Sequence, residues 1–160
     1  MNKKELEQKA IWFMKESNAI EGEAGLNDGD MEALYLAIEG INSLNDILDI
    51  HRVLTNHLGV DWSGRLRNVN VRVGGHCPPN HLKVVEKMKE YMLKFPLFDS
   101  YDAHNEFELI HPFQDFNGRV GRLIWLSKAI NEGYDFSIPF LQKYYYQTLG
   151  RIEKNKNLDI

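Results

Sequence analysis

The hydrophobic residues of this chain recur mostly at the spacing of one face of an α-helix. Near the N-terminus the apolar positions follow the pattern i, i+4, i+7 and i+8 of an amphipathic helix: Leu6, Ala10, Phe13 and Met14. Comparable stripes predict further helices over residues 30–38, 43–58, 80–95, 99–110 and 120–130, and a last one after Ser137. Asp30 and Ser43 are expected to cap the second and third helices. The pattern therefore predicts an all-α fold, a compact helical bundle.

One segment departs from the helical pattern. Residues 68–73 alternate polar and apolar side chains, and Gly74 and Gly75 follow, which predicts a short strand or small β-hairpin projecting from the helices. The chain shows no internal repeat and no linker rich enough in glycine, proline or serine to divide it. We therefore expect one domain over residues 1–160, with a frayed tail at residues 154–160.

The composition is that of a globular protein, since 43% of the 160 residues are hydrophobic and 26% are charged. The 19 basic residues are outnumbered by 23 acidic ones, and the net charge of −4 disfavours nucleic-acid binding over a broad surface. A few arginines can still hold one small polyphosphate. Cys77 is the single cysteine, which excludes an intramolecular disulfide and a cysteine zinc cluster. No signal peptide and no long apolar stretch is visible, so we expect no membrane association and a cytoplasmic location.

The residues best suited to chemistry lie between two predicted helices, in the sequence His111-Pro112-Phe113-Gln114-Asp115-Phe116-Asn117-Gly118-Arg119-Val120-Gly121-Arg122. The start of the following helix presents N–H groups and the positive end of the helix dipole, and both favour phosphate binding. Asn117 and Gly118 supply flexible backbone for such an anion-binding nest. Arg119 and Arg122 are three residues apart, so both can reach one polyphosphate from the same side.

Two further groups in this segment indicate phosphate chemistry. The carboxylate of Asp115 is suited to a magnesium ion shared with phosphate oxygens. An imidazole titrates near neutral pH, so His111 is suited to act as general base on a substrate hydroxyl. The alternative is a corner between two helices that is held by surface ion pairs. Taken alone, the residues predict an anion site and go no further.

Residues 111–122 resemble the Fic motif, His-Pro-Phe-x-Asp/Glu-Gly-Asn-Gly-Arg followed by a further Arg, and segments 62–67, 71–74 and 78–79 occur in the order of that family. The resemblance implies a compact helical domain that transfers AMP from ATP to a hydroxyl group of a protein and releases pyrophosphate. It implies that His111 is the base, Asp115 the magnesium ligand and Phe113 an apolar anchor of the loop. It also implies phosphate contacts from four residues: Asn117, Gly118, Arg119 and, at the γ-phosphate, Arg122. Gly118 stands where the Doc-like kinases of the family carry lysine, which favours AMP transfer.

In that family the segment matching Val71, Arg72, Val73 and Gly74 is a flap, a hairpin over the active site. The resemblance implies that its backbone lies against the nucleotide and that its edge receives the target protein by strand pairing. ATP, magnesium and an unidentified hydroxyl-bearing target protein are therefore the expected partners, and a homo-oligomer is left open.

Phe116 stands where the family motif has glycine. A positive φ at this position would strain an aromatic residue and distort the nest, whereas a negative φ would make Phe116 a local hydrophobic contact. The alternative to an active enzyme is therefore a Fic-like regulatory module that binds nucleotide or a partner without turnover.

A second motif lies near the N-terminus, where residues 17–22 resemble the inhibitory Ser/Thr-x-x-x-Glu-Gly/Asn motif of many Fic proteins. Ser17 and Glu21 are four residues apart, which places one above the other on a helix. The resemblance implies that Glu21 pairs with Arg122 and inhibits AMP transfer in cis. Because this glutamate can position water in some family members, a hydrolase that removes AMP is a further alternative.

The remaining histidines, at positions 51, 57, 76, 81 and 104, lack the spacing of a zinc site, so we expect no histidine metal centre. His51 is expected to pack within the apolar stripe of its helix. Three tyrosines fall on the predicted last helix, which contacts adenine in family members: Tyr144, Tyr145 and Tyr146. One or two of them are expected in the core.

Overall fold

The structure is a computed structural model that describes residues 1–133. The predicted last helix, its three tyrosines and the tail at residues 154–160 lie outside the described residues. The chain divides into two compact units, one of which contains Met1–Leu26 while the other spans Asn27–Tyr134. Among the described residues, no helix has both the length and the apolar character needed to cross a bilayer.

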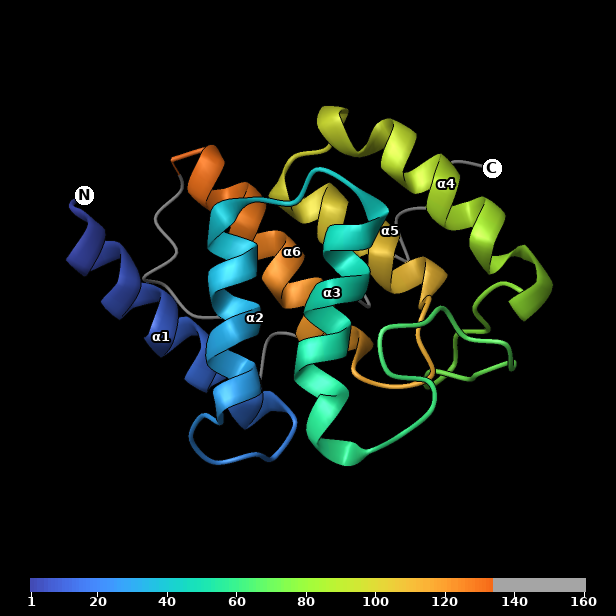
Figure 1. Ribbon diagram of the computed structural model, residues 1–160. Coiled ribbons are helices and arrows are strands. Elements are labelled where there is room, and N and C mark those ends of the chain that lie inside the picture. The colour runs from blue at the N-terminus through green and yellow to red at the C-terminus, as the bar shows by residue number, and fades with distance from the viewer. Residues whose placement is uncertain (134–160) are drawn as a thin grey trace. The chain divides into compact units, whose positions relative to one another are not determined.

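The first unit contributes helix α1, Lys3–Ile20 (Figure 1). Asn2 caps the helix, because its side chain accepts a hydrogen bond from the N–H of Glu5 at 2.9 Å. In the last turn of α1, the Asn18 side chain donates to the carbonyl of Gly25 at 3.0 Å. This bond ties the turn that follows the helix to the end of α1. The helix predicted at the N-terminus is confirmed.

The second unit contains five α-helices and three short 3₁₀ helices in its described part (Figure 1). Their bounds, in chain order, are α2 Asp28–Glu39, α3 Leu44–Thr55, η1 Asn56–Leu58, η2 His81–Lys83, α4 Val84–Lys94, η3 Phe95–Leu97, α5 Ser100–Ile110 and α6 Asn117–Asn131. The helical fold class predicted from the hydrophobic pattern is confirmed.

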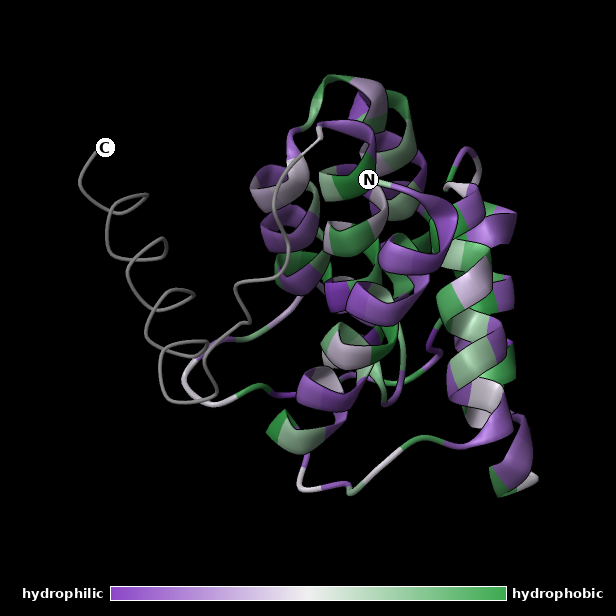
Figure 2. Ribbon diagram, turned by 90° about the vertical axis from the view of Figure 1, so that its left-hand side faces the viewer, coloured by the Kyte–Doolittle hydropathy of each residue, from purple (hydrophilic) through white to green (hydrophobic). Residues whose placement is uncertain are grey.

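Helix α6 lies at the centre of the second unit and packs against α2, α3 and α5. Its apolar side chains are buried on nearly all sides of the helix: Val120, Leu123, Ile124, Trp125, Leu126 and Ala129. A helix buried on all sides belongs to the middle of a domain. Figure 2 shows the same pattern for this unit, in which hydrophobic segments of the helices face inward and purple segments cover the outside.

Reciprocal capping boxes start α2 and α3. The Ser43 hydroxyl accepts from the N–H of Asp46, and the Asp46 carboxylate accepts from the N–H of Ser43, so the predicted cap of α3 is confirmed. The predicted cap of α2 is wrong by three residues, because Asn27 is the N-cap. Asp30 is the third helical residue. Its N–H donates to the Asn27 side chain, and its carboxylate accepts from the N–H of Asn27.

The predicted hairpin at residues 68–75 is reduced to one antiparallel bridge, between Val73 and His76. Side chains satisfy the backbone on either side of the bridge and leave no strand ladder there. The carbonyl of Val69 accepts from the guanidinium of Arg67, and the Asn70 side chain accepts from the N–H of His81. Alternating polarity was therefore a sign of a loop whose polar groups bond to side chains and to the start of η2, rather than of a strand.

Candidate active site

The loop at residues 111–116 joins α5 to α6 and begins and ends on left-handed backbone. His111 ends α5 with φ 49°, and Phe116 precedes α6 with φ 67°. These two are the non-glycine residues with positive φ in the described part of the chain. Left-handed backbone costs an ordinary residue about 1–2 kcal/mol, so the surrounding contacts must hold the loop in place. Phe116 therefore has the positive φ that is expected to strain an aromatic residue.

A reciprocal pair of hydrogen bonds closes the loop from within. The Asn117 side chain accepts from the N–H of Phe113 and donates to its carbonyl, both at 2.9 Å. Both residues are buried. Asn117 therefore braces the loop through its side chain, beyond the backbone role predicted for it, and Phe113 is the apolar anchor that the family resemblance implied.

His51 on α3 supports the loop from outside. Its ring stacks on the ring of Phe113, with centroids 3.8 Å apart and planes within 2°. The N–H of Gly64 donates to Nδ1 of His51 at 3.0 Å, so Nε2 carries the hydrogen and donates to the carbonyl of Asp115 at 3.1 Å. Burial lowers the pKa of His51 to about 4, against smaller opposing effects of Asp115, which keeps the ring neutral. The predicted packing role is correct and incomplete, because His51 also holds the loop backbone.

Arg67 joins the end of α5 to both ends of the segment at residues 68–79. Its Nε donates to the carbonyl of His111 at 2.8 Å, and one terminal nitrogen lies 3.4 Å from the carbonyl of Ile110. The guanidinium also donates to the carbonyls of Val69 and Pro79, at 2.9 and 2.6 Å. The side chain is buried, so one cation satisfies the C-terminal carbonyls of α5 and sets the root of this segment.

The sequence contained a signal for the supporting role of His51 but none for that of Arg67. His51 interrupts an otherwise apolar stripe, and a buried polar residue requires partners. Arg67 directly precedes the alternating segment, and nothing local indicates that it is buried.

The segment predicted to be a flap is connected to α5 at its turn. The ring of His76 donates from Nε2 to the carbonyl of Leu109 at 3.2 Å. Gly74, with φ 55°, makes the turn before His76. Val71 is half-buried, whereas Arg72, Val73 and Gly74 are exposed. The structure thus places the segment along the C-terminal end of α5, next to the loop that carries His111.

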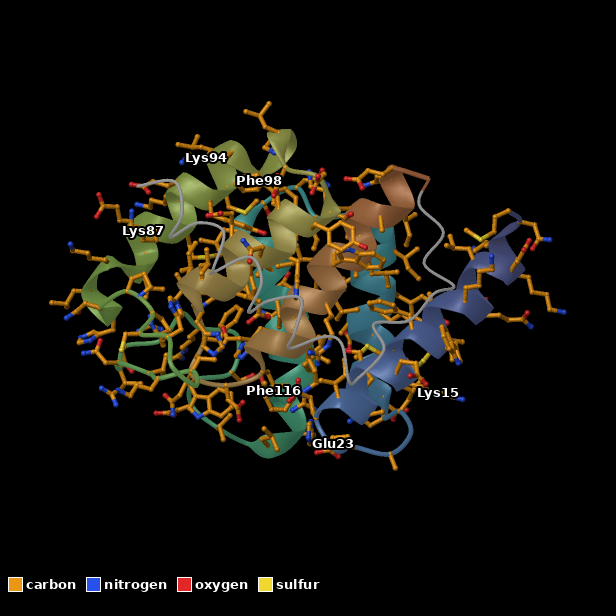
Figure 3. The ribbon with its side chains drawn as sticks, turned by 180° about the vertical axis from the view of Figure 1, so that it is seen from behind. Lys15, Glu23, Lys87, Lys94, Phe98 and Phe116 are labelled. Atoms are coloured by element: carbon orange, nitrogen blue, oxygen red, sulfur yellow. The ribbon has the colours of Figure 1, made fainter. Side chains whose placement is uncertain are left out.

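The two arginines of the motif differ in their surroundings. The Arg119 guanidinium lies over the Phe116 ring, 3.5 Å from its centroid, which is cation–π geometry. Arg122 is fully buried. Phe116 contributes no side-chain cap to α6, so an anion can approach the first turn of that helix. Phe116 itself is seen in Figure 3 at the start of α6, at the opposite end of the unit from Phe98.

Asp115 is exposed on the same loop. One carboxylate oxygen accepts from the N–H of Phe116 at 2.7 Å. Among residues 1–133, no group of three or more histidine, cysteine, aspartate and glutamate side chains is arranged to hold a metal. A single exposed carboxylate fits a magnesium ion whose other ligands are water and substrate phosphates.

The two residues of the inhibitory motif lie in the first unit. Ser17 is in the last turn of α1, and Glu21 is the C-cap, its N–H donating to the carbonyl of Asn18 at 3.0 Å. The helix ends at Ile20, so the motif straddles the helix end.

The site therefore consists of a histidine at the end of α5, a braced loop, and the start of α6, where the N-cap residue supplies no side-chain hydrogen bond. A model of the Fic/DOC family matches residues 41–126, more than half of the chain, which includes this loop. The chain belongs to the Fic/DOC family.

Curated relatives are similar in sequence to much of this chain. It is 31% identical over 135 residues to a protein adenylyltransferase Fic from Aedes aegypti, covering 72% of this chain and 27% of the relative. It is 31% identical over 149 residues to a protein adenylyltransferase Fic from Drosophila virilis, covering 80% of this chain and 31% of the relative. The chain thus spans less than a third of the length of these relatives.

Solved structures share the fold. A Fic family protein from Desulfovibrio desulfuricans superposes with a TM-score of 0.70 at 23% identity, over 96% of this chain and 60% of that one. A Fic-1 structure from C. elegans superposes with a TM-score of 0.65 at 20% identity, over 94% of this chain and 57% of that one.

The neutral state of His51 makes the stability of the protein pH-dependent. Between pH 6.5 and 4 the unfolded chain takes up a proton at His51 and the folded protein does not. The free energy of unfolding should therefore fall with decreasing pH, by about 1.4 kcal/mol per unit from this residue. Urea denaturation at pH 7, 6 and 5 measures the slope, and His51→Gln should flatten it while the exposed-site variant His57→Gln should not. An unchanged slope in His51→Gln would contradict the assignment.

Replacing Phe116 tests whether strain or packing dominates at this position. Phe116→Gly removes backbone strain of about 1–2 kcal/mol. It also removes a buried ring, worth about 3 kcal/mol or more, and a cation–π contact of about 1 kcal/mol. We expect the variant to be less stable by about 2 kcal/mol in urea denaturation. Phe116→Leu, which retains both the strain and most of the volume, is the control, and a Phe116→Gly protein more stable than wild type would refute this balance.

Proposed function

We propose that this protein is a protein adenylyltransferase, which transfers AMP from ATP to a hydroxyl side chain of a target protein. The observation that carries the proposal is the loop at residues 111–116, which joins His111 at the end of α5 to the start of α6, a helix without a side-chain cap from its N-cap residue. The curated relatives named protein adenylyltransferase Fic support it. The net charge of −4 also favours a nucleotide over a nucleic acid as the phosphate-bearing substrate.

The phosphates of ATP would bind at the start of α6. Phe116 leaves this helix without a side-chain cap, so the N–H groups of the first turn and the helix dipole favour an anion there. Gly118 allows a phosphate to approach the backbone closely. Arg119 is half-exposed beside the same turn, and Arg122 follows one turn later. These two cations would neutralise charge on the phosphates and on the pyrophosphate that leaves.

Asp115 would hold the magnesium ion, which draws negative charge from the phosphate oxygens when it is bound. The His51 bond to the carbonyl of Asp115 and the Phe116 N–H bond to its carboxylate fix both parts of this residue. The carboxylate therefore needs little reorganisation to take part in binding.

His111 would act as the general base. The target hydroxyl gives its proton to the imidazole while its oxygen forms a bond to the α-phosphorus of ATP. The bond from that phosphorus to the bridging oxygen breaks, and pyrophosphate leaves with the electron pair. The AMP group is then attached to the protein through a phosphodiester.

The segment at residues 71–74 would receive the target protein. Val73 and His76 form one backbone bridge, and Arg72, Val73 and Gly74 are exposed, so the segment can pair with an extended peptide. Arg67 and His76 connect the segment to α5, which carries His111. A peptide docked there would lie close to the base.

The proposal includes autoinhibition by Glu21 acting on Arg122. Arg122 is fully buried, and it is the second arginine of the loop-and-helix motif that the sequence comparison with the family singles out. Glu21 stands in the motif that carries this role in the family, and ATP would compete with it for the arginine. The protein would then be weakly active until this contact is released.

Removing the base should separate transfer from nucleotide binding. With [α-³²P]ATP and a cell lysate, His111→Ala should lose AMP transfer by about 10²–10⁴-fold, because general-base catalysis contributes that much. Calorimetry should show nearly unchanged ATP affinity, because the phosphate groups bind elsewhere. His57→Ala, at an exposed histidine, is the matched control. Transfer by His111→Ala at the wild-type rate would overturn the assignment, and incorporation of γ-label would indicate a kinase.

Releasing the inhibitory contact should raise activity. We expect Glu21→Gly to increase automodification with [α-³²P]ATP by about 5- to 150-fold, the usual range of coupling between two sites. Glu23→Gly is the matched control, since Glu23 is exposed two residues further on. Equal rates for Glu21→Gly and wild type would refute autoinhibition. The same assay is made on wild type, on Glu21→Gly and on each of these with Phe116→Gly added. If none of the four proteins transfers AMP while all of them bind ATP, the chain is a nucleotide-binding regulatory module.

A further inference from the structure

A group of polar side chains lies between α5 and α6, next to the loop that carries His111. His104, Glu108 and His111 follow one another at i, i+4 and i+7, so they share one face of α5. One carboxylate oxygen of Glu108, Oε2, lies 3.5 Å from Nδ1 of His111. The side chains of Glu108 and His111 are only 13% and 16% exposed, so this contact is largely shielded from water.

Gly121 on α6 provides the space for this group. A Cβ atom at this position would lie 2.5 Å from Oε1 of Glu108 and 3.0 Å from Nδ1 of His104. Glycine inside a helix costs about 1 kcal/mol relative to alanine, and Gly121 is not among the glycines with positive φ. Its place in α6 is therefore explained by the two polar side chains that approach the helix backbone.

Glu108 is an anion in this setting. Burial alone would raise the pKa of its carboxyl group, but His111, His104 and Arg122 together outweigh burial and hold the pKa below its usual range. His104 is buried, and burial is the main cause that lowers its pKa, so it is the neutral neighbour of the pair. The carboxylate therefore faces His111 as the charged partner.

We propose that Glu108 is a positioning residue for His111, accepting the Nδ1–H and leaving Nε2 to receive the proton of the substrate hydroxyl. This inference deepens the proposed function and rests on it. Arg67 holds the backbone of His111 through its carbonyl, and the Glu108 carboxylate faces Nδ1 of its ring at 3.5 Å. When Nε2 takes the proton, the imidazolium has a carboxylate beside it, which lowers the energy of the charge that develops during transfer.

The test compares Glu108→Gln with Glu106→Gln. Both remove one carboxylate from α5 with no change in size, and Glu106 does not lie on the His104–His111 face. Glu108→Gln should lower kcat by at least about tenfold, below the roughly 10⁴-fold effect of the orienting aspartate in serine proteases. The KM for ATP should change less than kcat, because the contact that is lost is with His111 and the residues proposed to bind the phosphates are all retained. Glu108→Asp, which retains the charge on a shorter side chain, should recover part of kcat.

Two further measurements distinguish positioning from a structural role. In the profile of kcat/KM against pH, the acid limb should move to lower pH in Glu108→Gln. The reason is that protonated His111 no longer has the carboxylate of Glu108 beside it. The other ionisable groups that interact with Glu108 in the described part of the second unit are the same in every variant: His104 on α5, Arg122 on α6 and Tyr91 on α4. In ¹⁵N-histidine spectra without ATP, wild type should show His111 with the hydrogen on Nδ1, and Glu108→Gln should populate the Nε2–H form.

The outcomes separate this inference from the proposed function. If neither wild type nor Glu21→Gly transfers AMP, the proposed enzymatic function is refuted. The ¹⁵N-histidine spectra, which do not depend on activity, would still test the contact between Glu108 and His111. AMP transfer by wild type with unchanged kcat, pH profile and tautomer in Glu108→Gln overturns the inference alone. Equal losses in Glu108→Gln and Glu106→Gln would also overturn it, because they would show a general effect of charge on α5.

Discussion

The guanidinium of Arg67 bonds to four backbone carbonyls from two different segments. Two of them belong to the C-terminal end of α5, at Ile110 and His111, and the other two flank the segment before η2, at Val69 and Pro79. Carbonyls at the end of a helix have no partner within the helix, and here a buried cation supplies one. The direction in which the chain leaves α5, and hence the position of His111, depends on this one side chain.

The loop that follows has two strained positions and is held by neutral contacts. His111 and Phe116 cost about 1–2 kcal/mol each in backbone energy. The bonds between Asn117 and Phe113 and the bonds of His51 offset this cost at about 1 kcal/mol each, and the stacked rings add to them. The loop therefore stays in one conformation while its polar edge remains accessible.

Phe116 shows how a strained residue can remain at a functional position. Its backbone has the left-handed conformation in which glycine is unstrained. Its ring is buried and lies under the guanidinium of Arg119. Packing of the aromatic side chain thus offsets the strain of its backbone, and the ring supports Arg119 at the start of α6.

The sequence by itself determined the parts of this protein that depend on near neighbours. Helical periodicity located α1 and the helices of the second unit, Ser43 marked the start of α3, and the segment from His111 to Arg122 indicated both the anion site and the family. These features are local, because a helix face, a cap and a loop motif are each set within a few residues.

Only the tertiary structure decided how the site is held. His51 reaches Asp115 across 64 residues and Arg67 reaches His111 across 44, and no local pattern reveals such pairs. The same reason applies to the predicted hairpin, which is reduced to the bridge between Val73 and His76, while the carbonyl of Val69 bonds to Arg67 and the Asn70 side chain bonds to the N–H of His81. The φ of Phe116 and the space that Gly121 leaves for Glu108 were likewise settled by packing between helices, which a sequence read along its length does not contain.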